Sequence, residues 1–124
     1  MKRITQYQRI LRRRQTVPLA GSHPIDPHLR SLLVHAVFAD AVVAPEEFET
    51  LALLIPEMPL QQLRQWVEVE AARPLDLDAI KAAFPLRSDR YALIQLVRTM
   101  VSIDHEVDPS EVALLDMLTL ALLD

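Results

Sequence analysis

The chain has 124 residues, a formal net charge of −4, nine prolines, one glycine and no cysteine, and 51% of its residues are hydrophobic. This length suits one domain with a core of ordinary size, and the missing cysteine excludes disulfides, thiolate metal sites and cysteine nucleophiles. Abundant Leu, Ala, Glu and Arg with few aromatic residues predict an all-α fold, a single compact bundle of about seven helices.

The N-terminal segment, residues 1–21, predicts a basic amphipathic arm. It contains six of the 13 basic residues and no acidic one, so the remainder carries seven basic against 17 acidic side chains. Residues 3–14 place apolar side chains at helical spacing. Two interpretations stay open: the arm binds nucleic acid or an anionic membrane surface, or it docks by its apolar stripe on the acidic body. The first interpretation assigns the binding to Arg9, Arg12, Arg13 and Arg14.

Two helices are predicted in the rest of the first half. Asp26 before Pro27 predicts an N-cap and a first turn, which open a helix through residues 32–39. Because this helix is apolar nearly all round, it belongs in the centre of a bundle. Pro45 then opens a second helix, which ends at the Pro56–Pro59 segment.

The second half predicts four more helices. An amphipathic outer helix starts at Leu60 and closes before Pro74, and Asp76 caps a short helix after it. A longer helix covers residues 87–103, and Pro109 opens the last one. The last helix is apolar on too many sides for one buried face. Either the chain wraps it fully, or it pairs with a second copy to form a homodimer.

A repeat relates the two halves of the chain. In each copy an apolar helix runs into an aspartate, a valine follows in the turn, proline opens the next helix, and a glutamate sits two positions further on. The aspartate side chain accepts hydrogen bonds in the turn, and the valine side chain anchors the turn in the core. The glutamate reaches back to the helix cap. Two such hairpins packed about a pseudo-twofold axis would form a compact bundle. With Asp40 aligned on Asp104, an offset of 64, the matched pairs are Leu32 with Leu96, Val37 with Val101, Val43 with Val107, Pro45 with Pro109, Glu47 with Glu111 and Leu51 with Leu115.

The two turn segments, residues 39–47 and 103–111, resemble the duplicated A-D-G-x-V-x-x-x-E signature of the TerB-like family, with Ala41 and His105 in place of the signature glycine. That family includes the tellurite-resistance protein TerB and the N-terminal region of the co-chaperone DjlA. The resemblance covers residues 27–123. It implies an all-helical domain over residues 22–124, no established enzymatic activity, and a link to tellurite resistance or stress response. It also implies acids that hold a divalent cation, Ca²⁺ or Mg²⁺.

The second turn carries the candidate cation site. The residues that match the signature, with their acidic neighbours, are Asp104, Glu106, Asp108 and Glu111, and the weaker pair in the first turn is Asp40 and Glu47. Carboxylate oxygens are the ligands that hard cations require. An EF-hand loop is excluded, because its sixth position is Pro109 instead of glycine and its twelfth is Leu115 instead of glutamate. The alternative is structural: Asp108 caps the last helix, Glu111 is its capping-box partner, and Asp104 ends the helix before it.

No sequence pattern indicates a catalytic site. A phosphate loop, a nucleophile elbow and a histidine pair with metal-ligand spacing are all missing, so we expect a non-enzymatic protein. His35, in an apolar helix, is interpreted as a hydrogen-bonded core residue or as a buried residue that binds no ligand. No apolar run approaches the roughly 20 residues needed to cross a bilayer, and the N-terminus lacks a secretion signal, which predicts a cytoplasmic protein.

Two function hypotheses follow from these observations. The first is a TerB-like interaction domain that acts through protein contacts and is tuned by a divalent cation at the second acidic turn. The second is a peripheral adaptor that uses the basic arm to hold an anionic membrane or nucleic acid. The identity of a protein partner is not encoded in any motif of the chain.

Overall fold

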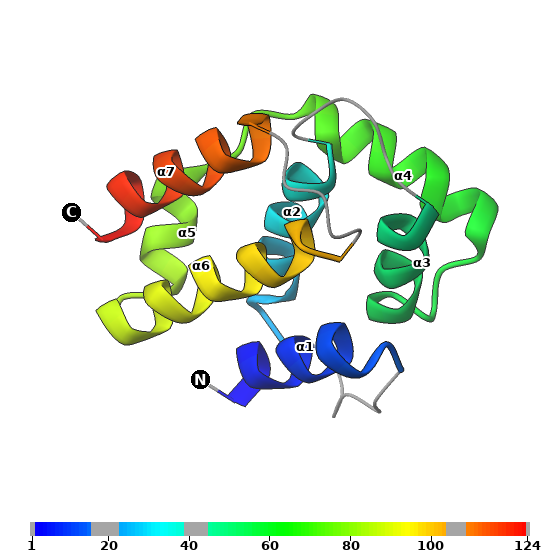
Figure 1. Cartoon of the computed structure of the whole chain (residues 1–124), viewed down its shortest axis with the longest axis horizontal. Coiled ribbons are helices and arrows are strands. Elements are labelled where there is room, and N and C mark those ends of the chain that lie inside the picture. Colours follow the sequence, from blue (N-terminus) through cyan, green and yellow to red (C-terminus); the bar gives the residue numbers. More distant parts are fainter. Residues whose placement is uncertain (1, 16–22, 39–44, 104–108, 124) are drawn as a thin grey trace.

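The computed structural model describes residues 2–15, 23–38, 45–103 and 109–123. Over these ranges the chain forms seven α-helices and no strand, which confirms the predicted all-α bundle (Figure 1). In chain order the helices are α1 (Lys2–Arg13), α2 (Asp26–Val37), α3 (Pro45–Leu54), α4 (Leu60–Ala72), α5 (Leu77–Ala83), α6 (Arg87–Val101) and α7 (Pro109–Leu123).

Helices α2 and α6 form the centre of the bundle. They pack against each other, α2 also contacts α3 and α4, and α6 also contacts α1 and α7. One hydrophobic cluster includes buried side chains from all seven helices, so the described helices share a single core. The apolar character of α2, from Leu29 to Val37, is explained by this central position.

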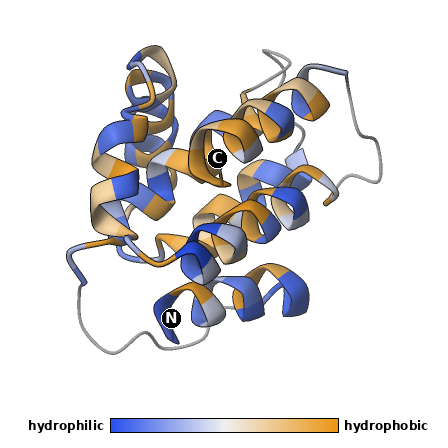
Figure 2. Ribbon diagram, turned by 90° about the vertical axis from the view of Figure 1, so that its left-hand side faces the viewer, coloured by the Kyte–Doolittle hydropathy of each residue, from blue (hydrophilic) through white to orange (hydrophobic). Residues whose placement is uncertain are grey.

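Helix α1 docks on the bundle by its apolar stripe. Ile4, Tyr7, Ile10 and Leu11 are buried in the shared core, and the helix packs against α6 and α3. Hydrophilic and hydrophobic positions alternate along it (Figure 2), as expected for a helix with one buried face. The helix is therefore an integral part of the core, and its basic side chains lie exposed at the surface, with the exception of Arg3.

Asp26 holds α1 in place and does not cap its own helix. The N-cap of α2 is Ile25, which makes no side-chain cap bond. Arg3 donates from Nε and Nη2 to the two carboxylate oxygens of Asp26, at 2.8 and 2.7 Å, and the Tyr7 hydroxyl donates at 3.1 Å. The predicted N-cap role of Asp26 is therefore wrong. The physical reason is that the buried guanidinium of Arg3 needs a carboxylate partner, which uses both oxygens.

The Asp26 carboxyl is held in its charged form. Burial alone would raise its pKa, but the Arg3 guanidinium, the His23 N–H at 3.0 Å and the Tyr7 hydroxyl together lower the pKa to about 2. Burial and the neighbouring Asp26 charge raise the pKa of Tyr7 to about 12. The contact between α1 and α2 therefore contains a buried ion pair at every pH near neutrality.

The predicted repeat has a counterpart in the helix ends. α2 ends at Val37 and α6 at Val101, while α3 begins at Pro45 and α7 at Pro109, so all four ends agree with the offset of 64 residues. Val43 and Val107, the expected core plugs, lie outside the described residues.

Proline and aspartate set the remaining ends as predicted. α3 and α4 each end two residues before a proline, Pro56 and Pro74. The Oδ1 atom of Asp76 accepts the N–H of Ala79 at 3.0 Å, which caps α5.

Candidate functional site

The predicted cation site lies mostly outside the described residues. Asp40, Asp104, Glu106 and Asp108 fall in the ranges 39–44 and 104–108, so cation binding and the capping role of Asp108 stay predictions. Within the described ranges, no group of three or more His, Asp or Glu side chains is placed to hold a metal ion.

The two remaining signature acids, Glu47 and Glu111, occupy equivalent buried positions. Each is the third residue of its helix, and their exposed fractions are 3% and 4%. Each of the two residues has at least one interaction partner. A carboxylate in the first turn is also favoured by the partial positive charge of the helix N-terminus. Their matched burial shows that the repeat extends from the helix ends to a pair of polar core residues.

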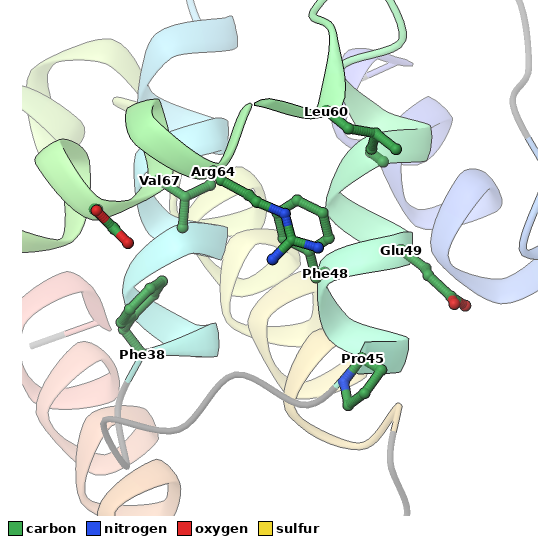
Figure 3. A pocket seen from close by; sticks show the side chains of 9 residues that line it. Phe38, Pro45, Phe48, Glu49, Leu60, Arg64 and Val67 are labelled. Carbon is green, nitrogen blue, oxygen red and sulfur yellow. The ribbon is translucent and has the colours of Figure 1, made fainter. Parts of the chain in front are cut away.

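A groove with a volume of about 650 Å³ opens between the end of α2, α3 and α4 (Figure 3). Its wall is mainly apolar. Phe38 comes from the C-terminal end of α2, Phe48 and Ala52 from α3, and Leu60 and Val67 from α4. Leu60 is 59% exposed, so the apolar wall continues to the surface.

Charged side chains lie around this apolar wall. The guanidinium of Arg64 lies over the Phe48 ring at 4.5 Å from its centroid, a cation–π contact that joins α4 to α3 (Figure 3). Glu49 and Glu68 also line the groove, and both are exposed. The groove therefore combines an apolar wall with two exposed acidic side chains.

The four arginines assigned to the arm are all exposed, but they do not share one site. Arg12 and Arg14 line a second cavity, of about 340 Å³, between α1 and α6, whereas Arg9 and Arg13 do not. Arg98 of α6 also lines this cavity and was missed from the sequence. In the sequence, Arg98 looks like any surface arginine on an amphipathic helix. Its place in the cavity becomes apparent only when α1 and α6 are placed side by side.

His35 is less deeply buried than either of its predicted roles requires. The side chain is half-buried, and its Nε2 atom is buried without a hydrogen-bond partner among the described residues. Burial lowers its pKa, although the Glu70 carboxylate and the backbone of Arg73 oppose this effect. The imidazole is therefore neutral at neutral pH and belongs to the contact between α2 and α4.

Helix α7 keeps an apolar outer face. Val112, Met117 and Leu120 are 45%, 39% and 65% exposed, so of the two alternatives for this helix, full wrapping by the chain does not hold over the described residues. Pairing with a second copy stays a prediction.

None of the described helices has the length and apolar character needed to cross a membrane. Comparisons with known proteins found no matching family model, no matching curated protein and no matching solved structure. The resemblance to the TerB-like family therefore depends on the duplicated turn pattern in the sequence.

Proposed function

We propose that this protein is a non-enzymatic, TerB-like interaction domain of the cytoplasm that holds an amphipathic helical segment of a protein partner in the groove between α3 and α4. The observation that carries the proposal is the apolar wall formed by Phe38, Phe48, Ala52, Leu60 and Val67. The duplicated turn pattern links the chain to the tellurite-resistance and stress systems in which TerB-like proteins occur.

An apolar groove between two helices favours a helix as its occupant. Amphipathic helices bind such grooves by inserting apolar anchors spaced three or four residues apart. Burial of one Leu or Phe side chain contributes about 1.5–3 kcal/mol, so two or three anchors against Phe48 and Leu60 would supply most of the affinity of a moderate complex.

The charge at the groove indicates the character of the partner. Glu49 and Glu68 are exposed there, and residues 22–124 hold all 17 acidic side chains of the protein. A partner helix with Lys or Arg beside its apolar face would complement this charge and associate faster than a neutral one. We therefore expect a basic amphipathic segment.

The composition of the groove supports binding rather than catalysis. Its described lining contains neither histidine nor a hydroxyl side chain. Arg64 is engaged with Phe48. The two glutamates are exposed to solvent, which keeps such groups from the desolvated setting that a general acid or base requires.

A selection from a displayed library of helical peptides tests the proposal. We expect enriched peptides to carry apolar residues at helical spacing with flanking Lys or Arg. Ala52→Arg would place a large charged side chain in the groove and weaken binding of these peptides by at least about tenfold. Leu120→Arg, on the exposed face of α7, is the matched control and should retain binding.

Two outcomes would contradict the proposal. One is a selection that enriches no peptide class. The other is a set of peptides that bind Ala52→Arg as well as the unchanged protein, since that result would place their docking surface elsewhere. Circular dichroism of both arginine variants verifies that each retains the helical fold.

A further inference from the structure

The cavity between α1 and α6 has features that the interaction groove lacks. Its volume is about 340 Å³, and its lining includes three arginines, Arg12 and Arg14 from the end of α1 and Arg98 from α6. The two helices lie next to each other in the bundle (Figure 1). We infer that this cavity binds a phosphomonoester, carried either by a small metabolite or by a phospholipid headgroup.

Among the described residues, no carboxylate neutralises the three guanidinium groups. No carboxylate appears among the described residues that line the cavity, and none of the three arginines forms an ion pair within the described structure. By contrast, Arg3, Arg30 and Arg73 each lie within 4 Å of a carboxylate. The cavity therefore gathers three positive charges that no described carboxylate pairs with, on a protein whose net charge is −4.

Capping of helix C-termini does not account for all three arginines. Both α1 and α6 end near this cavity, and each C-terminus carries a partial charge of about −0.5. Together these dipoles offset about one of the three positive charges. A surplus of about two charges is left for a ligand, which matches the dianionic form of a phosphomonoester near neutral pH.

Arg14 occupies a position where glycine would be more favourable. Its backbone φ is 54°, just after α1 ends, and its N–H donates to the Ile10 carbonyl at 2.9 Å. Glycine is the usual residue at such a left-handed helix end, and another residue costs about 1 kcal/mol there. The Arg14 side chain donates from Nη2 to the Ile103 carbonyl at 2.9 Å, which leaves its other N–H groups for the cavity.

Neutral side chains orient the second arginine. The Gln8 amide is best placed with its oxygen towards Arg12, because it then accepts from Nε and Nη2 of Arg12 at 3.3 Å each and from the Thr99 hydroxyl at 2.7 Å. A guanidinium held in this way loses less side-chain entropy when a ligand binds. The site is thus partly organised before the ligand arrives.

The size of the cavity and the type of donor favour a phosphate group. Guanidinium groups bind phosphate oxygens through paired N–H donors, and three of them can share the oxygens of one phosphate. A polynucleotide would need a basic surface that tracks along its backbone. Arg9 and Arg13 do not line the cavity, so the site includes only part of the basic surface of α1.

Calorimetric titration of the full chain with inorganic phosphate and with phenyl phosphate tests the site. Arg12→Gln and Arg98→Gln should each weaken binding by about tenfold, the loss expected for one charge-assisted contact of about 1.4 kcal/mol. Arg9→Gln and Arg13→Gln remove the same charge outside the cavity and should change affinity by less than about twofold at moderate salt. All four side chains are exposed, and circular dichroism checks that the variants fold.

Vesicles distinguish the two sources of the phosphate. Phosphatidylcholine vesicles that contain phosphatidic acid present a phosphomonoester, and vesicles that contain phosphatidylserine at equal surface charge do not. Preference for the first type that is lost in Arg98→Gln supports a lipid headgroup. Phosphate binding in solution without this preference supports a small metabolite.

The inference is overturned by any of three results. The first is that neither phosphate compound binds at millimolar concentration. The second is that Arg9→Gln or Arg13→Gln weakens binding as much as Arg12→Gln does. The third is that duplex DNA binds and requires all four arginines equally, which would indicate a diffuse basic surface instead of a site.

Discussion

The hairpin α2–α3 and the hairpin α6–α7 share a sequence pattern but pack differently. Their helix ends agree, and both bury the signature glutamate, Glu47 or Glu111. However, α7 packs more extensively on α6 than α3 does on α2. Leu51 is 1% exposed, whereas its counterpart Leu115 is only half-buried. The turn pattern therefore determines where helices start and stop, and other residues determine how closely they pack.

The interaction groove results from this difference. The α3 face that lines the groove carries Phe48 and Ala52, and the same offset relates them to Val112 and Asp116, which are exposed on α7. In the first hairpin α4 stands opposite this face, and in the described structure no helix stands opposite it in the second. Val112, part of the exposed apolar face of α7, is thus the counterpart of Phe48 in the groove wall.

The largest expected effect on stability comes from comparing Asp26 with Arg90, the residue that the offset of 64 places at the same position in the second half. Asp26 fixes α1, whereas Arg90 donates to the carbonyls of Phe84 and Lys81, at 2.7 and 3.0 Å, and so fixes α5. Asp26→Asn should lower the free energy of unfolding by about 4 kcal/mol, because it removes the negative charge that faces the buried Arg3 guanidinium. Arg90→Met should lower it by about 2 kcal/mol, the loss of two charge-assisted hydrogen bonds. Urea unfolding measures both free energies. Equal losses in the two variants would contradict the larger role given to Asp26.

The stabilities of Asp26→Asn and Arg90→Met should also depend differently on pH in the acidic range. Because the pKa of Asp26 is lowered to about 2 in the folded protein, its contribution is complete above its ordinary pKa of 3.8 and is lost as the pH falls through 2. Unfolding at pH values from neutral to about 2 should show a weaker loss of stability in Asp26→Asn than in the unchanged protein. Arg90→Met should keep the slope of the unchanged protein.

The next effect compares the outer helices through Leu51 and Leu115. Leu51→Ala removes a fully buried side chain and should cost about 3 kcal/mol. Leu115→Ala removes a half-buried one and should cost about 1 kcal/mol, since less apolar surface and a smaller cavity are involved. Chemical denaturation provides both values. If Leu115→Ala proved the more damaging, the second hairpin would have to be the more tightly packed around this position.

The smallest effect concerns His35, whose counterpart in the second hairpin is Thr99. Burial lowers the pKa of His35, so the unfolded chain binds more protons than the folded one, and stability is lost as the pH falls below about 6.5. His35→Leu removes this proton uptake and the buried Nε2 atom, and should raise stability at about pH 5 by about 1 kcal/mol. Thermal unfolding across this range provides the measurement. An unchanged pH dependence in the variant would show that His35 is not the titrating group.

Local chemistry was readable from the sequence. Seven helices, the breaks at Pro56 and Pro74 and the cap at Asp76 follow from backbone constraints that act within a few residues, and the structure confirms them. The same holds for the apolar stripe of α1, because helical spacing determines which side chains share a face.

Features that depend on contacts between distant segments were not predictable. Asp26 was assigned to its own helix because a cap is the commonest use of that residue type there, and its partner Arg3 lies 23 residues away. The arginine cavity requires Arg12 and Arg98 to come together from the two ends of the chain. Neither the groove nor the cavity has a contiguous sequence signal, since each is formed by single side chains from separate helices.

The contact between α1 and α6 also has a consequence for folding during synthesis. α1 leaves the ribosome before α6, yet Gln8 hydrogen-bonds to Thr99, 91 residues later. The part of α1 that packs on α6 therefore stays uncovered until α6 has emerged. During that interval the Arg3–Asp26 pair is available as an early partner, and it can hold α1 against α2 until α6 arrives.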